Sequence, residues 1–452
     1  MKKIILLLTL AISIGSLTAQ NNNGLKLPNA SPSQKVNYQF GSSQIELSYS
    51  RPNLRGRTVF QTNSELAPLG KFWRFGANSA TKITFKDKVI FGETEVNPGT
   101  YSILAIPNSD SWEIILNKDL TTNSENSYKQ SEDVARVKAA VKNTNQLSIN
   151  QQSFELGFSS QNPEQCNFDI SWGNAKLTIP IQLVDKNLAN TKALSPNNTI
   201  VQEFGVGNID LIYSSPSLKG RAVFQANSPL APLGQMWRLG ANAATSIKFS
   251  TDVSFGGKEV KAGDYVLYAI PNEKEWTIIL NKGLKNWGTG GYKESDDLVR
   301  IKATVQQLQN AESFESFNIN FEDVKSETGF LVFRWGTIQV SVELMTDIKK
   351  YVSKPMADSL SVKNVSLRSY NMGANYYFEF EKNYPKAVEC VQKVIEANPK
   401  AYWMYLLKAK ILKEMGQKEA AKEAALQCKN IATEEKNPDY VRFAQTLIDN
   451  LK

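Results

Sequence analysis

The 452-residue sequence contains no histidine. Histidine is the commonest general base near neutral pH and the commonest side-chain metal ligand. Its absence excludes serine–histidine triads, cysteine–histidine dyads and histidine-based zinc sites within this chain. We therefore expect no metal site and no cofactor.

Cysteine is also scarce, and the excess of basic residues is small. Cys166, Cys390 and Cys428 lie far apart and lack the spacing of metal ligands. Cys390 and Cys428 fall on apolar faces of expected helices, either as small buried residues or as a disulfide pair. The net charge of +8 is spread over the chain, without an arginine-rich block. We therefore expect no nucleic-acid partner.

The first 20 residues have the pattern of a secretory signal peptide. Two lysines precede a short apolar stretch, and small residues lead up to Ala19. A membrane anchor is disfavoured because three asparagines follow and no second long apolar segment occurs. We predict cleavage at Ala19 or Gln20, a periplasmic or secreted protein, and no transmembrane segment after processing.

One stretch of the sequence occurs twice. The copies are GRTVFQTNSELAPLGKFWRFGANSAT at 56–81 and GRAVFQANSPLAPLGQMWRLGANAAT at 220–245. When Tyr49 is aligned with Tyr213, about 40 of ~70 positions are identical without a gap. The length of the repeat predicts two homologous domains, residues 25–185 and 195–346, joined by a polar linker.

Each copy has a β pattern. Ile45, Leu47 and Tyr49 alternate with polar residues, which indicates half-buried antiparallel strands. Many short strands separated by glycine, proline and asparagine predict an antiparallel β-sandwich of jelly-roll type, with a closed barrel as the alternative.

After the second copy the pattern becomes helical, and we expect a third, α-helical domain at 355–452. Corresponding residues such as Ala387 and Ala421 recur about 34 residues apart, so the region resembles tetratricopeptide repeats. A simple helical hairpin is the alternative. A protein partner is expected at these helices.

Each β domain resembles the bacterial family called domain of unknown function 2911. The resemblance rests on Tyr-Ser-Arg-Pro at 49–52, Gly-Arg at 56–57, Trp-Arg at 73–74, Gly-Ala-Asn at 76–78 and their second-copy equivalents. In two places the sequence departs from the family: Ser215 replaces the arginine of Arg-Pro in the second copy, and Ser79 and Ala243 stand where the family often has glutamate. The resemblance implies no activity.

The repeated loops supply the candidate ligand-binding residues. Arginine forks suit carboxylate or phosphate, and tryptophan can stack on a sugar ring, so an anionic or carbohydrate ligand is expected. The alternative is that these side chains hold the long loop in place, with Arg74 and Arg238 donating to carbonyl groups. The candidates are Arg57, Trp73, Arg74, Asn78, Thr81 and Asn117, with Arg221, Trp237, Arg238, Asn242, Thr245 and Asn281.

An enzymatic role has less support. Glycoside hydrolysis needs two positioned carboxylates. The acids considered at positions shared by both copies are the pairs Glu95/Glu259, Glu132/Asp296 and Asp133/Asp297, and none lies in the repeated loop. We expect a non-enzymatic envelope protein that binds a ligand or a protein, with an enzyme acting on cell-surface carbohydrate as the alternative.

Overall fold

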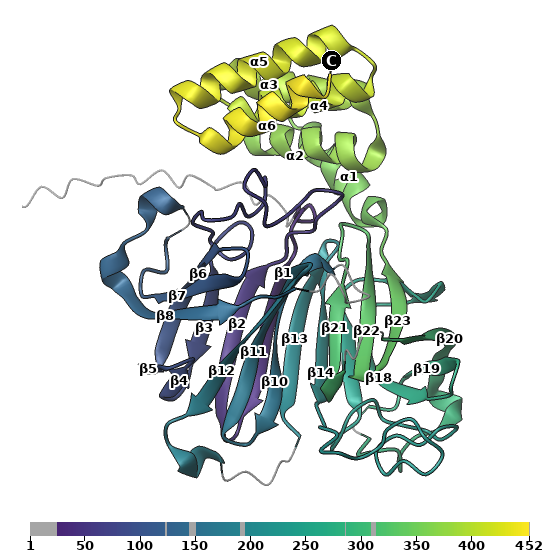
Figure 1. The fold of residues 1–452 in the computed structure, drawn as a ribbon. Coiled ribbons are helices and arrows are strands. Elements are labelled where there is room, and N and C mark those ends of the chain that lie inside the picture. The colour runs from purple at the N-terminus through teal and green to yellow at the C-terminus, as the bar shows by residue number, and fades with distance from the viewer. Residues whose placement is uncertain are drawn as a thin grey trace, which may run out of the picture. The chain divides into compact units, whose positions relative to one another are not determined.

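The computed structural model describes residues 25–122, 124–143, 151–189, 195–284, 286–308 and 313–451 (Figure 1). The expected signal peptide lies outside these residues. The chain divides into a unit that ends at Ile348 and holds both β domains, and a helical unit that begins at Lys349.

The first β domain is a sandwich of two antiparallel sheets, as predicted. The first sheet has the order β1 (Ser33–Phe40), β2 (Ser43–Ser50), β3 (Thr81–Phe85), β6 (Gly99–Pro107), β7 (Ser111–Asn117) and β8 (Asp133–Ala140). The second sheet has the order β10 (Gln151–Asn162), β11 (Gln165–Gly173), β12 (Ala175–Leu183), β4 (Val89–Phe91) and β5 (Thr94–Val96), and β9 (Lys142–Asn143) also pairs with β12.

The second β domain repeats this topology. Its first sheet has the order β13 (Asn197–Phe204), β14 (Gly207–Ser214), β15 (Thr245–Phe249), β18 (Gly263–Ile270), β19 (Glu275–Asn281) and β20 (Asp297–Gln307). Its second sheet has the order β21 (Phe314–Glu322), β22 (Thr328–Gly336), β23 (Ile338–Met345), β16 (Val253–Phe255) and β17 (Lys258–Val260). The end of β20 pairs with β23 and so joins the two sheets.

The alternating strand residues build the core between the sheets. Ile45, Leu47 and Tyr49 of β2 are buried, whereas the residues between them are partly exposed. Tryptophans fill the centre of each sandwich: Trp73 stacks on Trp172 with ring centroids 5.6 Å apart. The second domain repeats this stack, so side chains shared by the copies hold the two cores.

The first strands of the two domains pair with each other. β1 and β13 are antiparallel, and Val36 lies opposite Ile200, which is its equivalent in the second copy. The first sheets of both domains therefore form one continuous sheet with a local two-fold axis at this pair (Figure 1). Strands β10 and β21, at corresponding edges of the second sheets, also contact each other.

The C-terminal unit is helical, as predicted. Its helices are α1 (Ile348–Leu360), α2 (Leu367–Tyr376), α3 (Tyr384–Ala397), α4 (Tyr402–Glu414), α5 (Lys418–Glu434) and α6 (Pro438–Asp449), and a π-helical turn, Tyr377–Glu381, extends α2. α1 begins at Ile348, and Pro355 lies within it. Ala387 and Ala421 are fully buried, as close helix packing requires.

The three cysteines are separate buried thiols, so Cys390 and Cys428 form no disulfide. Burial raises the pKa of each of these two thiols to about 11. Across the described ranges, no helix combines the length and the apolar character needed to cross a bilayer. Short 3-10 turns, Glu125–Ser127, Gln130–Glu132, Lys186–Ala189 and Glu294–Asp296, complete the described elements.

Candidate functional site

The tryptophans of the repeated loop belong to the core. Trp73 and Trp237 are only 5% and 4% exposed. The backbone of Trp73 forms a two-way bridge with Ala105 of β6, which places its ring between the sheets. Trp237 does the same with Ala269 of β18. Neither ring is available to stack on a sugar.

Arg57 and Arg221 hold their own loops. Arg57 donates from Nε to the carbonyl of Leu54 and from Nη2 to that of Asn53, at 3.1 and 2.9 Å. Arg221 makes the equivalent bonds in the second copy, at 2.9 and 2.7 Å. A planar fork that spans two carbonyl groups fixes the turn, which is the structural role considered for the loop arginines.

The asparagine and threonine that follow in each loop also contact the protein itself. Asn78 adopts a φ of +57°, a left-handed conformation that asparagine tolerates, and donates to Ser50 Oγ and to the Ser31 carbonyl. Thr81 is buried and donates to the carbonyl of Phe75. Asn242 and Thr245 repeat the bonds to Ser214 Oγ and to the Leu239 carbonyl.

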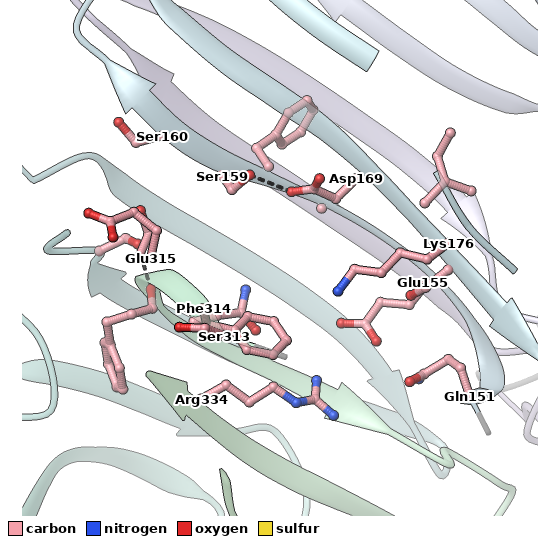
Figure 2. A pocket seen from close by; sticks show the side chains of 18 of the residues that line it. Gln151, Glu155, Ser159, Ser160, Asp169, Lys176, Ser313, Phe314, Glu315 and Arg334 are labelled. Atoms are coloured by element: carbon pink, nitrogen blue, oxygen red, sulfur yellow. Dashed lines mark hydrogen bonds between the residues drawn. The ribbon is translucent and has the colours of Figure 1, made fainter. Parts of the chain in front are cut away.

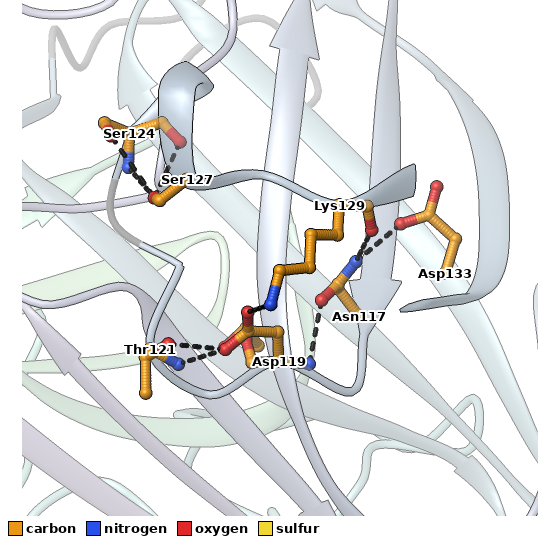
Figure 3. A network of polar contacts seen from close by, with 8 residues as sticks. Asn117, Asp119, Thr121, Ser124, Ser127, Lys129 and Asp133 are labelled. Atoms are coloured by element: carbon orange, nitrogen blue, oxygen red, sulfur yellow. Dashed lines mark hydrogen bonds and ion pairs between the residues drawn. The ribbon is translucent and has the colours of Figure 1, made fainter. Parts of the chain in front are cut away.

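Asn117 organises the loop between β7 and β8 (Figure 3). Its amide nitrogen donates to the Lys129 carbonyl and to Asp133 Oδ1, at 3.0 and 2.8 Å, while its amide oxygen accepts from the Asp119 backbone. Asn281 makes the same set of bonds in the second copy. Both side chains are fully buried, so they hold the loop and do not face a ligand.

Arg74 and Arg238 differ from the other ten candidates. Among the described residues, neither side chain makes a hydrogen bond or an ion pair, and the Nε atom of each is buried without a partner. The carbonyl clamp that we expected of them is made by Arg57 and Arg221. The structure thus assigns ten of the twelve candidates to intramolecular contacts and leaves these two arginines with unused donors.

A cavity of about 280 Å³ lies elsewhere, between the two β domains. Strands β10, β11 and β12 form one wall, and β21 and β22 form the other. Its polar lining includes Ser159, Ser160, Ser313, Ser316, Gln151, Asn318, Asp169 and Glu315. Domain interfaces are a common place for ligand pockets, which usually measure about 300–1,000 Å³. The volume suits a small ligand.

Charged groups converge on the ring of Phe314 in this cavity. The Lys176 ammonium lies 5.2 Å and the Arg334 guanidinium 5.4 Å from the ring centroid. Figure 2 shows the ends of Lys176, Glu155 and Arg334 turned toward the same space. Asp169 accepts hydrogen bonds from Ser159 and Thr178, and burial raises the pKa of its carboxyl.

Two glutamates form a buried acid pair beside the cavity. Burial, together with the negative charge of Glu322, raises the pKa of Glu155 to about 7. Burial also opposes ionisation of Glu322, but the adjacent Arg334 charge, 2.5 Å from its carboxylate, outweighs this and lowers the pKa. A hydrogen bond between the two carboxyl groups helps to keep Glu322 ionised, so Glu155 retains the shared proton.

Buried amides and Arg51 support the acid pair. Asn320 donates to Glu155 and accepts from Gln34 Nε2 at 2.9 Å. Gln34 also donates to Gln202, the acceptor that Arg51 reaches at 3.0 Å. These residues come from both domains, and the bonds between them fix one domain against the other. In such a network each polar group depends on the others for its partner.

The acid pair was missed because we considered only acids shared by both copies. Aligned on the equivalent Phe154 and Phe317, Glu155 corresponds to Asn318 and Glu322 to Ser159. The other charged residues of the cavity also have uncharged counterparts: Asp169 with Val332, Lys176 with Gln339, Arg334 with Ser171. The one usable signal was Ser215, which replaces Arg51 and lines the cavity. Positions that differ between the copies build the cleft.

No group of three or more acidic or cysteine side chains in the described ranges is arranged to hold a metal ion.

The structure defines the class of protein as a tandem β-sandwich with a polar cavity between its domains. The chain belongs to the family described as "Protein of unknown function (DUF2911)", which matches residues 31–181 and 195–344. No curated protein matches the chain.

Proposed function

We propose that this is an exported bacterial envelope or secreted protein that binds a small carbohydrate-like ligand, without catalysis, in the cavity between its β domains. The single observation that carries the proposal is the cavity lining, in which serines, amides and carboxyl groups stand beside the rings of Phe158, Phe314 and Phe317. Polyols need many hydrogen-bond partners in a small volume, and these side chains supply both donors and acceptors.

The site chemistry fits binding better than hydrolysis. In retaining glycosidases the two carboxyl groups stand about 5–5.5 Å apart with the sugar between them. Here Glu155 and Glu322 contact each other directly, and Arg334 holds the charge of Glu322. A sugar has no place between these carboxyl groups.

An enzyme acting on cell-surface carbohydrate is the second candidate. The observation that favours it is the acid pair, whose pKa values are shifted in opposite directions, with Glu155 at about 7. A pair of this kind can divide acid and base roles. Release of reducing ends from a bacterial glycan, abolished by Glu155→Gln, would establish this candidate and overturn the binding proposal.

The binding proposal is tested with mono- and disaccharides, using ligand-observed NMR followed by calorimetry. Lys176→Gln installs the side chain that the second copy carries at Gln339, so it is matched to the fold. We expect it, and Asp169→Asn, to weaken binding about tenfold, the effect of losing one good charged hydrogen bond. Lys35→Gln, on the exposed side of β1, is the control. Equal affinity in all three variants would contradict the proposal.

In the same proposal, the tetratricopeptide-like helices contact a protein partner, because stacked helix pairs of this kind present extended binding surfaces. Co-purification from cells that express the protein with and without residues 349–452 tests this part separately from the cavity.

A further inference from the structure

One tryptophan of the β domains faces water. Trp287 is 74% exposed, and the next most exposed large apolar side chain among the described residues, Leu284 at 48%, lies three positions away. The aligned residue of the first copy is Asn123, which is outside the described residues. The exposed ring is therefore a feature of the second copy, and the repeat does not account for it.

The backbone holds this tryptophan in place. Trp287 forms a β-bridge with Ala243 of the repeated loop, and the Ala244 N–H donates to the Asn286 carbonyl. The side-chain amide of Asn286 donates to the Tyr268 hydroxyl at 3.1 Å. The Asn286 side chain also occupies the space that a Cβ atom on Gly291 would need, which explains the glycine at this position. An anchored backbone presents the ring at a low entropic cost to binding.

Arg238 lies next to this loop. Its Nη1 atom is 3.9 Å from the position that a Cβ atom on Gly288 would occupy, and Gly288 follows Trp287 directly. Among the described residues, the Arg238 side chain makes no hydrogen bond or ion pair. The exposed indole of Trp287 can stack on a flat apolar face of a ligand. The guanidinium of Arg238, with its unused donors, can bind a carboxylate of the same ligand.

We propose that Trp287 and Arg238 form a surface site for an acidic glycan, in which a pyranose ring stacks on the indole and a uronic-acid carboxylate binds the guanidinium. Tryptophan suits this role because its large rigid face contributes contact area while its polar edge tolerates water. The site is separate from the cavity between the domains and does not rest on the function proposed there.

The test uses the full-length protein and oligogalacturonides as the probe, with neutral maltodextrins of the same length as the comparison. The six other tryptophans of the β domains are buried, and Trp403 in α4 is partly exposed, so the part of the fluorescence change that Trp287→Ala removes reports on Trp287. We expect oligogalacturonides to quench the emission and maltodextrins to bind at least about tenfold more weakly, since they lack the carboxylate.

Four variants complete the test. Trp287→Ala should abolish binding measured by calorimetry, and Arg238→Lys should weaken it about tenfold because lysine lacks the bidentate fork. Arg74→Lys, the equivalent change in the first copy, and Lys35→Gln on the exposed side of β1 should leave it unchanged. The proposal is overturned if oligogalacturonides do not bind, if Trp287→Ala binds as the parent does, or if maltodextrins bind equally well.

Discussion

Replacing Glu155 by glutamine should remove a pH dependence from the stability of the β domains. The pKa of Glu155 is raised from 4.5 to about 7 in the folded protein by burial and by Glu322. The folded state therefore keeps a proton that the unfolded chain releases between these values. The stabilisation is complete below pH 4.5 and is lost as the pH rises through about 7.

The size of the effect follows from the shift. At about 1.4 kcal/mol per pKa unit, it amounts to a loss on the order of 3 kcal/mol of unfolding free energy over this pH range. Glu155→Gln imitates the protonated acid, because its amide oxygen can accept from Asn320 and its nitrogen can donate to Glu322. At pH 8 the variant should therefore be more stable than the parent, and at pH 4.5 about equally stable.

Urea denaturation followed by tryptophan emission measures this effect, since buried tryptophans lie at the centre of both β domains. Other acids titrate in the same range, so the informative quantity is the difference between parent and variant at each pH. Glu93→Gln, an exposed position between β4 and β5, is the control and should give a flat difference. A flat difference for Glu155→Gln as well would refute the assignment of a buried, protonated Glu155.

Two further predictions concern the loops and the N-terminus. Arg57→Lys and Arg221→Lys should each lower the unfolding free energy by about 1 kcal/mol, because lysine cannot span two carbonyl groups, and the two effects should add because the domains are separate. Arg74→Lys and Arg238→Lys should unfold like the parent. The opposite ranking in urea denaturation would contradict the clamp at Arg57. Mass spectrometry of exported protein should find a chain that begins after Ala19 or Gln20, and an intact Met1 would contradict processing.

The repeat and the strand alternation were enough to predict the β fold, because both signals are local in sequence. Ile45, Leu47 and Tyr49 alternate whatever the strand pairs with. The pairing of β1 with β13 could not be predicted in this way, since an edge strand carries no pattern that identifies its neighbour.

The site was harder to predict than the fold. The candidate site residues were those identical in the two copies, such as Trp73 and Arg57. The structure places these residues in the core and in loop turns. Residues that two domains share must maintain the structure that both domains share. Glu155 corresponds to Asn318 and Trp287 to Asn123, so neither residue is conserved between the copies, and a comparison based on identity did not select them.

The pairing of Val36 with Ile200 has a consequence for the origin of the cleft. A single domain of this kind could associate with a second copy of itself through its first strand, and both walls of the resulting groove would then carry the same side chains. In such a dimer a glutamate at the position of Glu155 would occur on both walls. An arginine at the position of Arg334 would also occur on both walls or on neither. Covalent fusion of the two subunits removes this constraint, because each wall can then change independently. A single acid on one wall with a single counter-charge on the other is an arrangement that a symmetric homodimer of this domain cannot make, because each side chain would occur on both walls.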